Sequence, residues 1–75
     1  MNTASYQKAG DYMPDDAKVI KTAIDDFREI QRYMFVAKEE NAQKTYAALK
    51  EKYISLKTFL NFLEVNLTGI DEIKE

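Results

Sequence analysis

The chain has 75 residues, a formal net charge of −2 and a pI near 5.1, and it contains neither cysteine nor histidine. This length allows one domain at most, and the missing residue types exclude disulfides, thiolate metal sites and histidine metal ligands. The acidic balance argues against a polyanion as the main partner. Glycine occurs only at positions 10 and 69 and proline only at position 14, which is typical of helices joined by few turns.

Residues 1–13 show no sustained hydrophobic period. They combine small and polar side chains with two tyrosines, so we expect a mobile leader that precedes a helical domain over residues 14–75.

A first helix is predicted to begin at Pro14–Asp16. Proline is tolerated in the first turn of a helix, and aspartates suit the positive end of the helix dipole. Apolar side chains then recur at helical spacing and leave a charged face between them. They are Ile20, Ile24, Phe27, Ile30 and Met34.

The second half of the chain contains a heptad pattern. Apolar side chains recur in steps of four and three, which is the spacing with which a helix presents one stripe to a partner helix. The positions are Ala42, Tyr46, Leu49, Tyr53, Leu56, Leu60, Leu63 and Leu67.

The two stripes do not share one phase. Extending the second stripe backwards by heptads reaches Glu39, Phe35, Arg32 and Arg28, of which only one is apolar. One straight helix cannot keep both stripes on one side. We therefore expect a turn at residues 38–41 between helices over residues 15–38 and 41–66. A kinked or continuous helix is the alternative, because this turn lacks glycine and proline.

The C-terminal residues predict a further short helical turn. Asn66 can end the second helix, because asparagine tolerates the left-handed conformation. Thr68 with Asp71 three residues later is a variant of the capping box, and Ile70 and Ile73 supply an apolar side. We expect this turn to fold back over the open end of the hairpin or to lie on a neighbouring molecule.

These elements predict an all-α fold, a two-helix antiparallel hairpin with a short C-terminal helical turn. A single chain of this size buries only about 60% of its unfolded surface and is marginally stable alone, so we expect a homo-oligomer, most simply a dimer that forms a four-helix bundle. The expected core consists of Ile20, Ile24, Phe27, Ile30, Met34, Tyr46, Leu49, Tyr53, Leu56, Leu60 and Leu63.

The apolar residues outnumber those that one hairpin can cover. An apolar run near the end of the first helix and two phenylalanines beside the second stripe are the expected interface with a second molecule. These residues are Tyr33, Phe35, Val36, Phe59 and Phe62. The alternative for the run at 33–36 is enclosure by the loop and the leader of the same chain.

No pattern in the sequence indicates catalysis. Ser5 and Ser55 have no histidine to act as a base, two isolated glycines cannot form a phosphate loop, and the acidic residues fall on solvated faces. We therefore predict a non-enzymatic chain without a catalytic site, metal, cofactor or small-molecule substrate.

Two classes of function are compatible with this composition. The first is a protein-interaction or oligomerisation module, an accessory or regulatory protein of a bacterium or mobile element, with a protein partner as a possibility. The alternative is a nucleic-acid-binding regulator that uses the lysines of the second helix, although the acidity of the chain counts against it. These lysines are Lys44, Lys50, Lys52 and Lys57.

The sequence contains neither a run of about 18 apolar residues nor a basic start followed by an apolar core, so we expect a cytoplasmic protein without a membrane span. Residues 30–49 resemble one helix–turn–helix unit of the tetratricopeptide repeats. Such units stack in arrays of at least about three, so this resemblance assigns no family.

Overall fold

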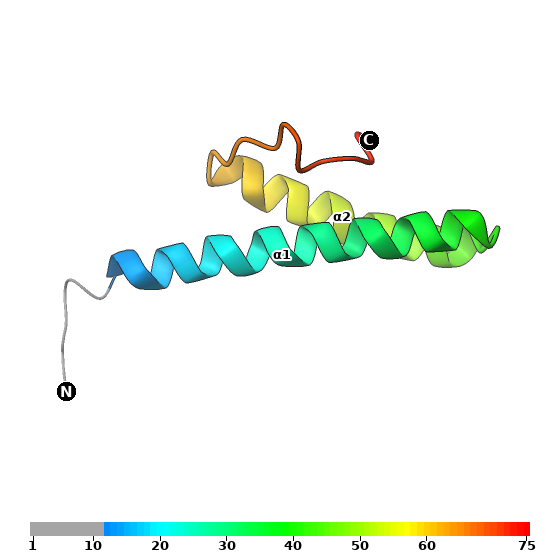
Figure 1. Cartoon of the computed structure of the whole chain (residues 1–75), viewed down its shortest axis with the longest axis horizontal. Coiled ribbons are helices and arrows are strands. Elements are labelled where there is room, and N and C mark those ends of the chain that lie inside the picture. The colour runs from blue at the N-terminus through cyan, green and yellow to red at the C-terminus, as the bar shows by residue number, and fades with distance from the viewer. Residues whose placement is uncertain (1–11) are drawn as a thin grey trace.

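The computed structural model describes the backbone of residues 12–75 and the side chains of residues 17–75. It contains two helices, α1 (Tyr12–Glu39) and α2 (Gln43–Phe62), which run antiparallel (Figure 1). The predicted helical hairpin is confirmed, and the described residues form no strand. Of the predicted leader, only Tyr12 and Met13 are described, and they already belong to α1.

The turn between the helices follows from two residues, Asn41 and Ala42. Asn41 has a φ of +57°, and the Ala42 amide donates a 2.9 Å hydrogen bond to the Ala37 carbonyl. The Asn41 amide bonds to the Lys38 carbonyl at 3.1 Å, which completes a Schellman motif. The turn predicted at residues 38–41 is therefore confirmed, and asparagine takes the place that glycine usually has.

The second helix ends earlier than predicted. It stops at Phe62 rather than Asn66, because Glu64 adopts a φ of +62° and the Val65 amide bonds to the Leu60 carbonyl at 3.0 Å. This is again a Schellman motif, whose two flanking apolar side chains characteristically meet, here Val65 and Leu60. Both belong to the hydrophobic core, so the turn gains apolar burial that a longer helix would lose.

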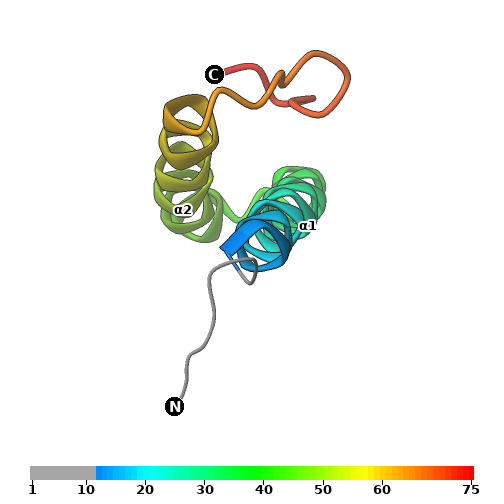
Figure 2. The same ribbon diagram turned by 90° about the vertical axis from the view of Figure 1, so that its left-hand side faces the viewer.

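The predicted C-terminal helical turn is not a helix. Residues 68–70 form one turn, in which the amides of Ile70 and Asp71 bond to the Leu67 carbonyl, and the following residues are irregular. We call residues 63–75 the strap. It runs back from the end of α2 and crosses one side of the hairpin, over both helices (Figure 2). The predicted fold-back therefore occurs, although over the middle of the hairpin instead of its open end.

The core lies between the two helices and under the strap. The rings of Phe27 and Tyr53 stack at 5.3 Å with an interplanar angle of 13°. Of the predicted core, five residues are buried and four pack partly buried against them. The buried five are Phe27, Ile30, Met34, Tyr53 and Leu60, and the partly buried four are Ile24, Tyr46, Leu49 and Leu56.

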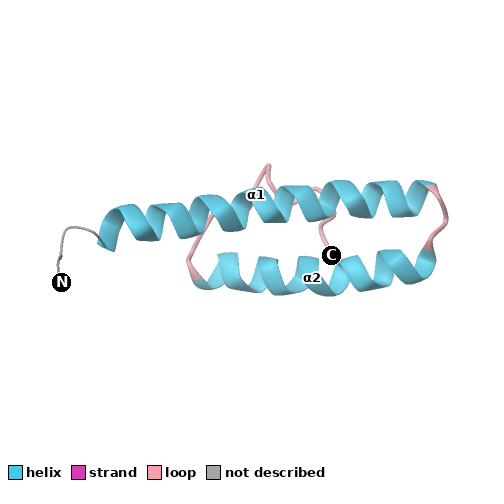
Figure 3. Ribbon diagram, turned by 90° about the horizontal axis from the view of Figure 1, so that it is seen from below, coloured by secondary structure: helices cyan, strands magenta, loops and turns pink. Residues whose placement is uncertain are grey.

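Ile20 and Leu63 are only half-buried and lie outside this core cluster. The first turns of α1 project past the end of α2, so the part of α1 around Ile20 has less of the second helix beside it (Figure 3). The sequence also failed to predict that Ala23 and Ala37 are buried.

Candidate functional site

The hairpin offers two surfaces, one on each side of the plane of its helices. The first is the strap groove, which is the side of the hairpin that the strap covers. The second is the open groove on the opposite side, which the described residues leave uncovered.

Gln31 connects α1 to the backbone of the strap. Its side-chain nitrogen donates hydrogen bonds to the carbonyls of Ile70 at 3.0 Å and Phe27 at 3.3 Å. Its side-chain oxygen accepts hydrogen bonds from the amides of Glu72 at 2.6 Å and Ile73 at 3.0 Å. Gln31 is 3% exposed, so all its polar capacity is used inside the protein, as a buried amide requires.

Tyr53 and Lys57 of α2 hold Asp71 of the strap. The Tyr53 hydroxyl donates a 2.7 Å hydrogen bond to Asp71 Oδ1, and Lys57 Nζ lies 2.8 Å from Oδ2. The Lys74 amide donates a further bond to Oδ1 at 2.9 Å. These partners satisfy a carboxylate that is 9% exposed, and unpaired burial of such a charge would be costly.

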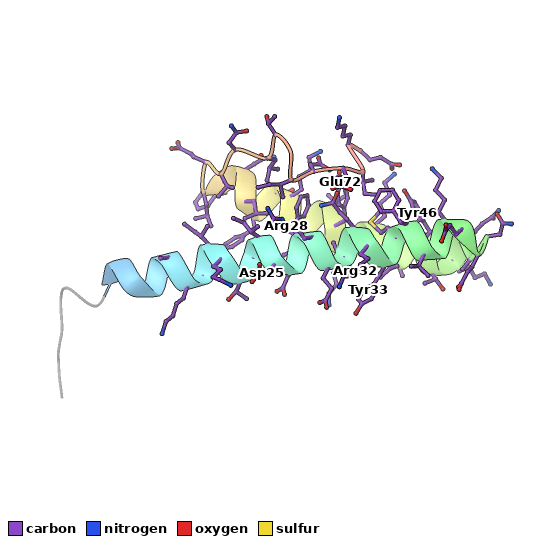
Figure 4. All side chains as sticks on the ribbon, viewed as in Figure 1. Asp25, Arg28, Arg32, Tyr33, Tyr46 and Glu72 are labelled. Carbon is purple, nitrogen blue, oxygen red and sulfur yellow. The ribbon has the colours of Figure 1, made fainter. Side chains whose placement is uncertain are left out.

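Glu75 makes a second set of contacts with α2. Its carboxylate pairs with Lys50 and accepts a 3.2 Å hydrogen bond from the Tyr46 hydroxyl. Its amide donates to the Tyr53 hydroxyl at 3.0 Å, and its carbonyl accepts from Lys57 at 2.8 Å. Figure 4 shows Tyr46 on the same side of the hairpin as Glu72 of the strap.

These contacts shift the protonation equilibria. Burial raises the pKa of Asp71, but the hydrogen bonds from Lys57, the Lys74 amide and Tyr53 outweigh it, and the pKa lies below its ordinary value. The hydrogen bond from Lys50 lowers the pKa of Glu75. The same bonds raise the pKa values of their lysine partners, Lys57 through Asp71 and Lys50 through Glu75.

Burial, assisted by the charge of Glu75, raises the pKa of Tyr46. The lowered pKa values of the two acids and the raised pKa values of the two lysines favour their charged forms at neutral pH. All of these contacts are therefore formed at that pH.

The four lysines proposed as nucleic-acid contacts do not form one face. Lys50 and Lys57 are paired with acidic groups of the strap. Lys52 lines the open groove on the other side of the hairpin, and Lys44 is exposed in the first turn of α2. A groove that tracks a phosphate backbone needs cations on one continuous surface, and these positions do not supply it.

The open groove is formed by residues of both helices. One hollow of about 470 Å³ lies between Asp26, Ile30 and Tyr33 of α1 and Lys52, Ser55 and Leu56 of α2. A second of about 390 Å³ follows along the same side, where Val19, Thr22 and Ala23 face Leu56 and Phe59. Asp26 and Leu56 line both hollows, so the two are continuous.

The five predicted interface residues are all exposed, from 40% for Phe59 to 81% for Phe62. The structure brings Tyr33 and Phe59 to the open groove. Phe35 instead lines a hollow on the strap side, together with Arg28 and Ile70. Val36 and Phe62 line neither groove, so the predicted set does not form one surface.

The sequence did not predict Gln31 and Asp71 as polar contacts of a groove. Gln31 could have been noticed, because it follows Phe27 by four residues and precedes Met34 by three and therefore faces the core. The sequence pattern does not indicate the role of Asp71, because its two partners on α2 lie 14 and 18 positions away in the chain.

The described residues show neither a cluster of metal-ligating side chains nor a membrane-spanning helix. Among the side chains of residues 17–75, acidic groups do not gather in a cluster of three or more that could hold a metal ion. Neither helix in that range is long and apolar enough to span a bilayer.

Comparisons with protein-family models, with curated proteins and with solved structures found no match to this chain.

Proposed function

We propose that this chain is a non-enzymatic self-association module, in which two copies join through their open grooves to form a four-helix bundle. The observation that carries the proposal is the pair of exposed apolar side chains in this groove, Val19 at 51% and Phe59 at 40% exposure. They lie over the buried Ala23 and beside the half-buried Leu56. A facing helix of a second copy would bury these apolar side chains together.

The open groove is also self-complementary in charge. Asp26 and Lys52 line the same hollow from opposite helices, and neither has an ion-pair partner among residues 17–75. A two-fold axis parallel to the helices would set α1 of one copy over α2 of the other at the same height. Asp26 would then face Lys52 of the second copy, and the reverse pair would form too.

The same axis gives a bundle in which each helix is antiparallel to its neighbours. Such bundles pack apolar stripes of facing helices into one core. The strap lies on the far side of each hairpin and does not obstruct this pairing (Figure 2). We place this module in the cytoplasm, which the absence of cysteine supports.

Light scattering coupled to size exclusion tests the proposal. The wild-type chain of 8.7 kDa is expected to have twice that mass. Phe59→Glu should give a monomer that keeps its helical circular dichroism, because a charge in the interface core is not compensated. A monomeric wild type would exclude the proposal.

Ile54→Glu is the matched control for Phe59→Glu. Ile54 also lies on α2 and is 41% exposed, but it is about 140° around the helix from Phe59. This variant should remain a dimer. Loss of the dimer in both variants would show that the effect is not specific to the open groove.

A further inference from the structure

The strap groove holds an irregular segment of its own chain through side chains of both helices. We propose that it binds an extended acidic segment of a partner protein, with the pattern apolar–Asp–acidic–apolar, and that residues 70–73 of the strap occupy this site within the same chain. This inference does not depend on self-association, because the strap groove and the open groove lie on opposite sides of the hairpin.

Gln31 holds the strap by its backbone. One buried side-chain amide contacts three backbone groups, the carbonyl of Ile70 and the amides of Glu72 and Ile73. These contacts fix the position and direction of an irregular segment without depending on its side chains. Any segment with the same backbone conformation would satisfy Gln31 equally well.

Side chains of α2 bind the acidic side chains of the strap. Tyr53 and Lys57 hold both oxygens of Asp71, and Lys50 and Tyr46 hold the carboxylate of Glu75. Charged partners of this kind form the strong hydrogen bonds that give specificity.

Cations border the other edge of the groove as well. Arg28 and Arg32 of α1 line a hollow of about 390 Å³ together with Glu72 of the strap. The groove is therefore basic along both helices, and its occupant is acidic at three positions out of five between residues 71 and 75. Complementary charge steers a partner with the same pattern to this site.

Helix side chains attach the strap to the hairpin, and Leu67, Ile70 and Ile73 pack against the core. Beyond Val65, every described hydrogen bond between the strap and the helices involves a side chain of α1 or α2. The described backbone-to-backbone bonds of residues 66–75 stay within the strap. Replacement of the strap by another segment therefore breaks no helical hydrogen bond.

The strap groove extends beyond the residues that occupy it. Past Glu75 a hollow of about 340 Å³ continues toward the interhelical turn, lined by Ala37, Lys38, Gln43 and Tyr46. A longer acidic segment would find a further cation there in Lys38.

A labelled peptide with the sequence of residues 65–75 tests the proposal by fluorescence anisotropy. The receptor is the full chain with Asp71→Lys, whose own strap has lost its contacts with Tyr53 and Lys57. This variant should bind the peptide at least about tenfold more tightly than the wild type, because the tethered strap no longer competes at its high effective concentration.

Three controls define the site. A peptide with asparagine in place of its aspartate should bind about tenfold more weakly, which corresponds to one charged hydrogen-bond set. Adding Lys57→Gln to the receptor should weaken binding similarly. Adding Lys52→Gln, the same charge change in the open groove, should leave peptide binding unchanged.

The wild-type chain provides a second measurement in case Asp71→Lys does not fold. Excess peptide should accelerate hydrogen exchange of the Glu72 and Ile73 amides, which Gln31 protects in the closed strap. Absence of this acceleration, or of binding to a folded Asp71→Lys variant, overturns the proposal. If Phe59→Glu is still a dimer and excess peptide dissociates it, a second copy of the chain supplies the strap. That result would overturn the assignment to a different partner.

Discussion

The Tyr53 hydroxyl donates a 2.7 Å hydrogen bond to Oδ1 of Asp71 and thereby joins the second helix to the C-terminal strap. The same tyrosine stacks its ring on Phe27 of the first helix. One fully buried side chain thus connects all three segments of the structure. Val65, Leu67, Ile70 and Ile73 pack the strap against the core, and these polar contacts fix its course. The stability of the strap should therefore respond to single-atom changes and to pH.

Tyr53→Phe should destabilise the chain by about 2 kcal/mol. It removes the hydroxyl that donates to the charged Asp71 carboxylate, which is then left with fewer partners. The stacked ring remains, so the helices should persist. Urea denaturation gives the free energy of unfolding, and hydrogen exchange of the Glu75 amide reports the strap. Tyr46→Phe, at an exposed hydroxyl, is the matched control and should cost less than about 1 kcal/mol.

Acid should release the strap. The pKa values of Asp71 and Glu75 are lowered from ordinary values of 3.8 and 4.5, so their stabilisation is complete above those values. It is lost as the pH falls through the lower pKa values of the folded chain. Amide chemical shifts of Glu72 and Ile73 should follow this transition, and Asp71→Asn should remove much of it. An unchanged titration in that variant would contradict the assignment.

Leu60→Ala should cost about 2–5 kcal/mol, because it leaves a cavity in a core of only a few residues. Leu60 is fully buried and packs in the cluster that Val65 joins from the strap. The midpoint of urea unfolding measures the loss. Phe62→Ala, at a residue that is 81% exposed, removes a larger side chain but should change stability by less than about 0.5 kcal/mol.

Glu64→Gly should stabilise the chain by about 0.5–1 kcal/mol. Glu64 has a φ of +62°, and a left-handed conformation is costly for residues with a Cβ but not for glycine. The same substitution at Glu51, in the exposed middle of α2, should destabilise by about 0.5–1 kcal/mol. Thermal unfolding compares the two variants, and equal signs would argue against the Schellman motif at Glu64.

Reversing one charge of the open groove should weaken the proposed dimer. Asp26→Lys or Lys52→Asp alone sets like charges against each other and should lower the association constant at least about tenfold, whereas the combined exchange should restore it. Sedimentation velocity measures association. Exchange of the exposed Lys21 and Asp25 pair, whose charged atoms lie 3.0 Å apart on α1, is the control and should have no effect. Failure of the double exchange to restore the dimer would refute the Asp26–Lys52 contact.

The sequence by itself determined the two helices, their antiparallel pairing and most of their inner faces. Hydrophobic periodicity is a local property, and the mismatch of phase between the two stripes required a turn that Asn41 could form. The apolar stripes of the two helices can be buried only against each other, so the core residues around Phe27 and Leu60 followed from spacing alone.

Only the tertiary structure decided the course of the strap. Residues 66–75 carry helix-compatible signals, but Val65 and Ile70 gain more by packing on the hairpin, and Gln31 and Tyr53 satisfy the polar groups that an irregular segment exposes. These partners are 18 to 42 positions away in sequence. Contacts between such distant residues produce no periodic pattern in the sequence. For the same reason, the sequence did not show that the exposed apolar residues are divided between two grooves.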